Sequence, residues 1–143
     1  VENPNVKEQM IEHLGGIVAY STVDFGTAIG NCVNRGKIEM ESLAQWAYVG
    51  GIAGEVDGNI ENLQNYGEVS SKVTFASDTA KSTWAAASYV GGIAGQHSLP
   101  RKYSGENRDL LNEGNVLAVF DNRIENGDFI VGGVVGNAEP AYR

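Results

Sequence analysis

The feature that most constrains this chain is an internal repeat built on paired glycines. A phrase with two adjacent glycines followed by Ile or Val occurs four times, at 13–19, 48–54, 89–95 and 130–136. The glycine pairs begin at positions 15, 50, 91 and 132, so the copies are spaced by 35 or 41 residues. A repeat of this size is typical of stacked units that bury their apolar side chains only against their neighbours.

A second phrase, Asn-x-Gly-x-(Ile/Val), follows each of the first three copies. It lies in the segments 29–38, 60–69 and 107–116, the last of which is the loosest match. Asn and Gly tolerate left-handed backbone conformations, so this phrase predicts a tight corner between two strands. The stretches 70–88 and 96–106 account for the uneven spacing, and we expect them to be loops or insertions.

The phrases are short, β-branched and interrupted by Gly and Asn, which favours strands over helices. We expect three strands per repeat: one at the Gly-Gly phrase, one before Asn-x-Gly and one after it. Stacking such units predicts an all-β fold, a parallel β-solenoid of about three to four repeats with coils about 4.8 Å apart. The predicted inward rows are Leu14, Val49, Val90 and Val131; Ile17, Ile52, Ile93 and Val134; Cys32, Leu63 and Leu110; and Ile38, Val69 and Val116. Cys32 replaces a leucine in its row, which indicates a buried thiol that acts as a small apolar side chain.

The start of the chain shows a different pattern. Asn5 and Glu8 have capping-box spacing, and Val6, Met10 and Leu14 are four residues apart, which predicts a short helix. We expect residues 1–13 to cap the open end of the stack and residues 14–143 to form the repeat domain. The fourth copy holds only the first phrase, so we expect the chain to be a fragment of a longer protein.

These phrases resemble the GLUG repeat of bacterial secreted and surface proteins, which reads roughly Val-Gly-Gly-(Leu/Ile)-(Val/Ala)-Gly, a gap, and then Ile-x-Asn-Cys-x-Asn-x-Gly-x-Val. Residues 49–69 match it almost throughout, with Leu63 in place of the Cys, and Cys32 stands at the Cys position of the first copy. The chain departs from the pattern at Ala19, where Gly is expected, and at Asn107, where Ile is expected. Such repeats occur in large adhesin-like proteins and in some IgA-cleaving bacterial metalloproteases. The resemblance implies an extracellular, non-catalytic stalk or interaction module.

Charge and motifs exclude several classes of function. The net charge is −8 and the pI is near 4.6, which argues against nucleic acid and anionic membranes as partners. No apolar run approaches the roughly 20 residues that cross a bilayer. The one cysteine and the two histidines, His13 and His97, form no zinc motif, and we expect surface or cap roles for both histidines. We expect no cofactor, no metal and no catalytic residue.

Acidic pairs keep one enzymatic alternative open. Parallel β-solenoids host enzymes that cleave sugars with two carboxylates about 5–9.5 Å apart. Glu55 and Asp57 alternate along a predicted strand, and Asp121, Glu125 and Asp128 form a second cluster. The favoured interpretation of the first pair is a solvated turn at 57–59, and calcium binding by either cluster is a lesser alternative.

Aromatic and amide side chains complete the candidate site residues. Trp46, Trp84 and Tyr103 lie in the variable stretches, where they either contact a ligand or cover the edges of the core. Asn34, Asn65 and Asn112 occupy one position of the repeat and predict a side-chain ladder along the stacked corners. The function expected is therefore a structural or adhesive module at the bacterial surface, with a host or cell-surface protein or glycan as partner. The alternative is a carbohydrate-active enzyme.

Overall fold

The computed structural model describes residues 11–43, 46–74, 86–98, 107–121 and 127–139. It confirms an all-β fold of stacked parallel strands, and the described residues contain no helix. The strands are β1 (Ile11–Gly15), β2 (Val18–Asn34), β3 (Ile38–Ser42), β4 (Trp46–Gly50), β5 (Ala53–Asn65), β6 (Val69–Thr74), β7 (Ala86–Gly91), β8 (Ala94–Ser98), β9 (Arg108–Asn112), β10 (Val116–Asp121), β11 (Gly127–Gly132) and β12 (Val135–Glu139).

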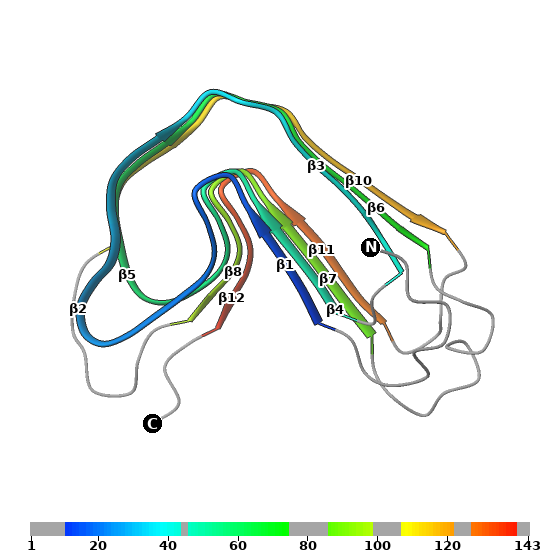
Figure 1. Ribbon diagram of the computed structural model, residues 1–143, viewed down its shortest axis with the longest axis horizontal. Coiled ribbons are helices and arrows are strands. Elements are labelled where there is room, and N and C mark those ends of the chain that lie inside the picture. The colour runs from blue at the N-terminus through cyan, green and yellow to red at the C-terminus, as the bar shows by residue number, and fades with distance from the viewer. Residues whose placement is uncertain (1–10, 44–45, 75–85, 99–106, 122–126, 140–143) are drawn as a thin grey trace.

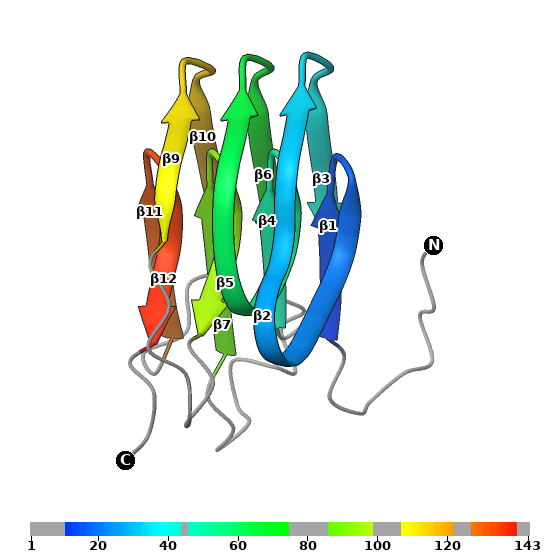
Figure 2. The same cartoon turned by 90° about the vertical axis from the view of Figure 1, so that its left-hand side faces the viewer.

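Three parallel sheets collect the equivalent strands of successive repeats. The first sheet has the order β1-β4-β7-β11, the second β2-β5-β8-β12 with β9 also paired to β5, and the third β3-β6-β10. Viewed along the stack, each of the first two repeats runs up one strand of the first sheet, turns back, curves around the second sheet and descends along the third (Figure 1). The side view shows the repeats as successive layers (Figure 2). Equivalent strands of successive repeats therefore lie directly on one another.

The register of the strands confirms the four predicted rows. Leu14 pairs with Val49, Val49 with Val90, and Val131 with Val90. The Ile row is joined by backbone bonds, because the amide of each residue donates to the carbonyl one layer on, from Ile17 through Ile52 and Ile93 to Val134. Cys32, Leu63 and Leu110 are in register, as are Ile38, Val69 and Val116.

Two apolar clusters form the core. One lies between the first and third sheets around Met40, Val49, Val69, Val73 and Val90. The other lies within the curve of the second sheet, and its buried members are Ile29, Ile52, Ala53, Val56, Ile60, Leu63, Ile93 and Ala94. Row members with a layer on each side are buried, whereas the end members of the same rows are half-buried or exposed: Ile52 is 0% exposed and Ile17 53%. Burial therefore depends on having a layer on both sides.

The Gly-Gly phrase forms a strand up to its first glycine and then a corner, so the expectation of a strand there is confirmed only for the first part of the phrase. The strands of the first sheet end at the first glycine of each pair, and the second sheet begins three residues later. A Cβ at Gly50 would lie 2.0 Å from the carbonyl oxygen of Ala53, because the chain turns back immediately. The strand after this corner continues without a break to the Asn-x-Gly phrase in β2 and β5. Each of these two repeats thus has a short strand, a long curved strand and a third strand.

Two further expectations about the elements need correction. The stretch 70–88 is not a loop throughout, because its first part continues β6, where alternate side chains of Val69, Ser71 and Val73 are buried. The predicted helix at the start of the chain does not extend through residues 11–13, which lie in β1; residues 1–10 lie outside the described residues. Pairing of Leu14 with Val49 places Leu14 against the core, and this contact outweighs the local four-residue spacing.

The left-handed residues of the second phrase are also not the ones expected. Positive φ angles occur at Asn31, Asn62 and Asp109, which form one row three residues before the ladder asparagines. The corner glycines are required for another reason. A Cβ at Gly67 would lie 1.9 Å from the carbonyl oxygen of Gly36 in the layer below. Close stacking of the layers, rather than backbone handedness, therefore selects glycine at this corner.

Cys32 lies in the predicted row but is only half-buried. It packs against the second core cluster, and its Sγ contacts the carbonyl oxygen of Gly30 at 3.3 Å. Its partner Leu63, which has a layer on each side, is 1% exposed. The end position of the first repeat explains why the thiol is less buried than the leucine of the next layer.

Candidate functional site

The buried corner of the fold carries a ladder of asparagine side chains. The Nδ2 of Asn34 donates to the Oδ1 of Asn65 at 2.7 Å, and the Nδ2 of Asn65 donates to the Oδ1 of Asn112 at 2.8 Å. Each amide also donates to the carbonyl of the glycine two residues later, Gly36, Gly67 or Gly114, at 2.8–2.9 Å. Asn65 is fully buried. The ladder satisfies polar groups at the corner and links three successive layers.

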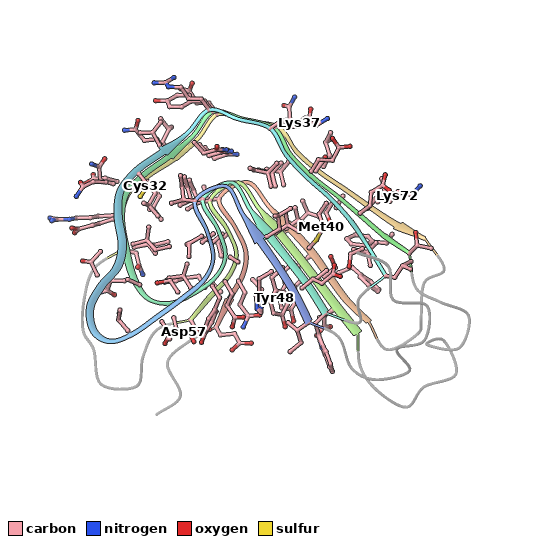
Figure 3. The ribbon with its side chains drawn as sticks, viewed as in Figure 1. Cys32, Lys37, Met40, Tyr48, Asp57 and Lys72 are labelled. Atoms are coloured by element: carbon pink, nitrogen blue, oxygen red, sulfur yellow. The ribbon has the colours of Figure 1, made fainter. Side chains whose placement is uncertain are left out.

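A second group of side chains lies on the face of the first sheet that points away from the core around Met40 and Val49. We name it the aromatic–acid cluster, and it comprises His13, Tyr20, Tyr48, Glu55, Asp57 and Tyr89. These residues come from β1, β2, β4, β5 and β7, and Figure 3 shows Tyr48 and Asp57 at the opening where the first and second sheets diverge.

Direct contacts hold the aromatic–acid cluster together. The Nε2 of His13 lies 2.5 Å from the Oε2 of Glu55, and the Tyr20 hydroxyl donates to the Oδ2 of Asp57 at 2.8 Å. The rings of Tyr48 and Tyr89 are stacked with centroids 5.1 Å apart, and the His13 ring lies 5.3 Å from Tyr48. Both carboxylates are therefore bound by side chains of the first repeat, and the rings form a column along the stack.

Partial burial shifts the ionisation of these groups. Burial raises the pKa of Glu55, while the hydrogen bond from His13 and its charge act in the opposite direction. Burial raises the pKa of Tyr48 to about 12. The hydrogen bond to Asp57 raises the pKa of Tyr20, and burial raises that of Tyr89. The cluster thus disfavours further negative charge at its tyrosines.

Two expectations about this region are wrong. Asp57 does not lie in a solvated turn: residues 57–59 continue β5, where Gly58 has a φ of 136° and Asn59 is 4% exposed. His97 is not at the surface, because it is buried and its Nε2 donates to the carbonyl of Gly58 at 2.8 Å. The side chain of Val56, its neighbour in register, is also buried, so this row points into the fold.

The remaining predicted site residues are placed only in part. Trp46 lies in β4, half-buried and in register with Ile11 and Ala87. Trp84, Tyr103 and Glu125 lie outside the described residues, as does the side chain of Asp121. In the described part of the chain, no group of three or more His, Cys, Asp and Glu residues is arranged to hold a metal ion.

Sequence reasoning does not find the aromatic–acid cluster as a unit. Tyr48 and Tyr89 share one repeat position, and His13 stands at that position in the first copy, so the row is visible in the sequence. Tyr20 gives no such signal, because its register partner is Glu55. The only sequence signal for the cluster is therefore the row of rings, His13, Tyr48 and Tyr89. It does not show which polar residues lie beside that row.

The chemistry open to the cluster follows from its two carboxylates. Glu55 and Asp57 are two residues apart on a strand, which places their Cα atoms roughly 6.6 Å apart. Two carboxyl groups on one face of a strand are the residue types that cleave a glycosidic bond, where one carboxyl is kept protonated by a raised pKa. Against this, each carboxylate already accepts a hydrogen bond from within the chain. The stacked rings offer a surface for a sugar or a peptide with no chemistry required.

Among the described residues there is no helix long and apolar enough to span a bilayer. No protein-family model, curated protein or solved structure matches this chain significantly.

Proposed function

We propose that this chain is a non-catalytic β-solenoid module, similar to GLUG repeats, from a bacterial surface or secreted protein. Its role is structural or adhesive, and its partners are further repeats of the parent chain and a host or cell-surface protein or glycan. The observation that carries the proposal is the Asn34–Asn65–Asn112 ladder, which joins equivalent corners of three layers through buried hydrogen bonds. Such a ladder serves the continuation of the stack, which is what a stalk requires.

The contacts of the aromatic–acid cluster support the same proposal. Glu55 and Asp57 are each bound by a residue of the preceding layer, His13 and Tyr20. These bonds tie the first repeat to the second. In this proposal the carboxylates stabilise the stack, and the half-buried rings beside them offer contact area to a partner.

One observation favours a second candidate, a carbohydrate-active enzyme. Burial raises the pKa of Glu55, as expected for a general acid, and Asp57 follows on the same face of β5. In that case Glu55 would protonate the leaving oxygen and Asp57 would activate water.

A polysaccharide assay separates the two candidates. The intact chain is incubated with a panel of neutral and acidic polysaccharides, and new reducing ends are measured. The double variant Glu55→Gln/Asp57→Asn is compared with Glu39→Gln/Glu41→Gln, a pair with the same spacing on exposed positions of β3. The module proposal predicts no release by any of the three proteins. Release that only the Glu55/Asp57 variant loses, by several powers of ten, would overturn it.

A further inference from the structure

We propose that the free edges of β9 and β10 bind an extended polypeptide segment with the phrase Leu-x-Asn-x-Gly-x-Val, which adds to the stack as one more parallel layer. The inference rests on the proposed module function, and it names the chemistry of one partner. The occupant is a peptide strand, which is recognised through its backbone and through a repeat-like set of side chains.

The last layers of the fold form a step. β11 and β12 extend the first and second sheets beyond β7 and β8. Within the described ranges, no strand lies on the outer edges of β9 and β10, which pair only with β5 and β6. Figure 2 shows β9 and β10 ending the upper part of the stack, while β11 and β12 end the lower part. The step is therefore one strand deep.

The apolar side chains at this step are less buried than their partners one layer below. Leu63 and Val69 are 1% and 0% exposed, whereas Leu110 and Val116 in register with them are only half-buried. Phe120 is half-buried above the fully buried Val73. An added layer would bury these side chains as the third repeat buries those of the second, with apolar contact as the driving force.

The asparagine ladder at the step also has a hydrogen-bond donor left for an added layer. Asn65 uses its Nδ2 twice, toward Gly67 and toward Asn112. Asn112 donates to Gly114, and no second bond from its Nδ2 occurs among the described residues. An amide nitrogen carries two hydrogens, so Asn112 has one left for an Asn side chain in the next layer. The ladder therefore specifies Asn at this position of the occupant.

The backbone hydrogen bonds predict the same register for the occupant strand. The amide of Val69 donates to the carbonyl of Asn115 at 2.8 Å, one layer up. By the same pairing, the amide of Val116 would donate to the carbonyl of the occupant residue that precedes its Val. In a parallel pair successive bonds are evenly spaced, so the residue after the occupant's Val would donate back to the carbonyl of Val116. Unpaired edges of this kind accept strands readily.

The chain's own second repeat supplies a probe with the right sequence. A peptide of residues 60–74 would place its Leu63 over Leu110, its Asn65 over Asn112 and its Val69 over Val116, as those residues pair in the fold. Its Glu61 would lie beside Arg108, whose guanidinium already contacts a Glu61 carboxylate at 3.2 Å. The charge at this end of the peptide is therefore complementary to the site.

The test measures binding of the fluorescently labelled 60–74 peptide to the intact 143-residue chain by anisotropy. Three altered peptides are compared: Asn65→Leu, an N-methyl group on Ser70, and an N-methyl group on Ser71. Ser70 is the residue expected to donate to Val116, and the Ser71 amide points away from the site in the same register. We expect saturable binding that is weakened about tenfold or more by Asn65→Leu and by methylation of Ser70, and less than about threefold by methylation of Ser71, since tenfold corresponds to about 1.4 kcal/mol.

NMR of the labelled chain locates the bound peptide. Amide shifts confined to β9 and β10, with β1 to β3 unchanged, support the proposal. It is overturned by an absence of saturable binding, by equal binding of the two N-methylated peptides, or by shifts at the opposite end of the stack. It is also overturned if copies of the chain associate and exclude the peptide, because the occupant is then a second copy. The polysaccharide assay is unaffected by any of these results, so the two proposals fail separately.

Discussion

The side chain of Asn65 lies directly against Gly51. A Cβ at Gly51 would stand 2.5 Å from the Cγ of Asn65 and 2.2 Å from the carbonyl oxygen of Gly92. The same relation joins Gly92 to Asn112, where the distance to Cγ would be 2.2 Å. The two repeated phrases of the sequence are thus two halves of one contact, in which a glycine corner makes room for the asparagine ladder.

This contact predicts that Gly51→Ala is strongly destabilising. The added methyl group must displace backbone and a buried amide, so we expect a loss of about 3 kcal/mol in the free energy of unfolding. Gly133 is the matched control, because it holds the same repeat position in the last layer and a Cβ added there would meet no atom within 4 Å. Gly133→Ala should change stability by less than about 0.5 kcal/mol. Urea denaturation of both variants measures the difference, and equal losses would contradict the contact.

The ladder predicts a large cost for Asn65→Ala. This change removes one acceptor and two donors at a fully buried position and leaves the amide of Asn34 and the carbonyl of Gly67 without their partner. Each unsatisfied buried group costs about 1–3 kcal/mol, so we expect a total loss of about 2–6 kcal/mol. Asn115→Ala, at an exposed position of the same corner, serves as the control and should fall within about 0.5 kcal/mol of the parent. Similar losses from both changes in thermal or urea unfolding would rule out a buried ladder.

How much of this can be read from the sequence depends on the kind of contact. The rows are predictable because Leu14, Val49, Val90 and Val131 repeat an apolar side chain at one position of the repeat, and the same argument gives the position of the ladder. The aromatic–acid cluster is not predictable as a unit, since His13 contacts Glu55, which is 42 residues away and holds a different position of the repeat.

The departure at Ala19 has a physical explanation that the sequence alone does not provide. A Cβ at Gly54, the equivalent residue, would meet the carbonyl of Ala19 at 2.7 Å and the amide of Leu14 at 2.8 Å, both in the preceding layer. Gly95 and Gly136 likewise meet backbone atoms of the layer before them. The described residues contain no layer before β1 and β2, so a methyl group is tolerated at Ala19. Glycine at this position is a requirement of stacking rather than of the turn.

Ser88→Ala is expected to stabilise the protein. The Ser88 hydroxyl is fully buried between the first and third sheets and has no hydrogen-bond partner among the described residues. Its neighbour in register, Ala47, shows that alanine fits this row. Removing an unsatisfied buried hydroxyl should raise the free energy of unfolding by about 1 kcal/mol. A loss of stability on urea denaturation would show that the hydroxyl has a partner.

The pKa of Glu55 predicts a pH dependence of stability. Burial raises this pKa in the folded state above its ordinary value of 4.5, so the folded protein binds the proton more tightly than the unfolded chain. Stability must then fall as the pH rises from about 4.5 through the folded pKa, and level off above it. Glu55→Gln removes the titrating group and should flatten this fall. Chemical denaturation of both proteins between about pH 4 and pH 7 measures the two slopes, and a parent protein that gains stability relative to Glu55→Gln over this range would reverse the sign.

The stacking of equivalent residues in register is tested most directly by methyl NOEs in the folded protein. With layers about 4.8 Å apart, the methyl groups of Val90 lie between those of Val49 and Val131. NOESY spectra of a methyl-labelled sample should show cross-peaks from Val90 to Val49 and from Val90 to Val131, and none between Val49 and Val131, which are two layers apart. A strong cross-peak between Val49 and Val131, or no contact from Val90 to either, would contradict the parallel stack.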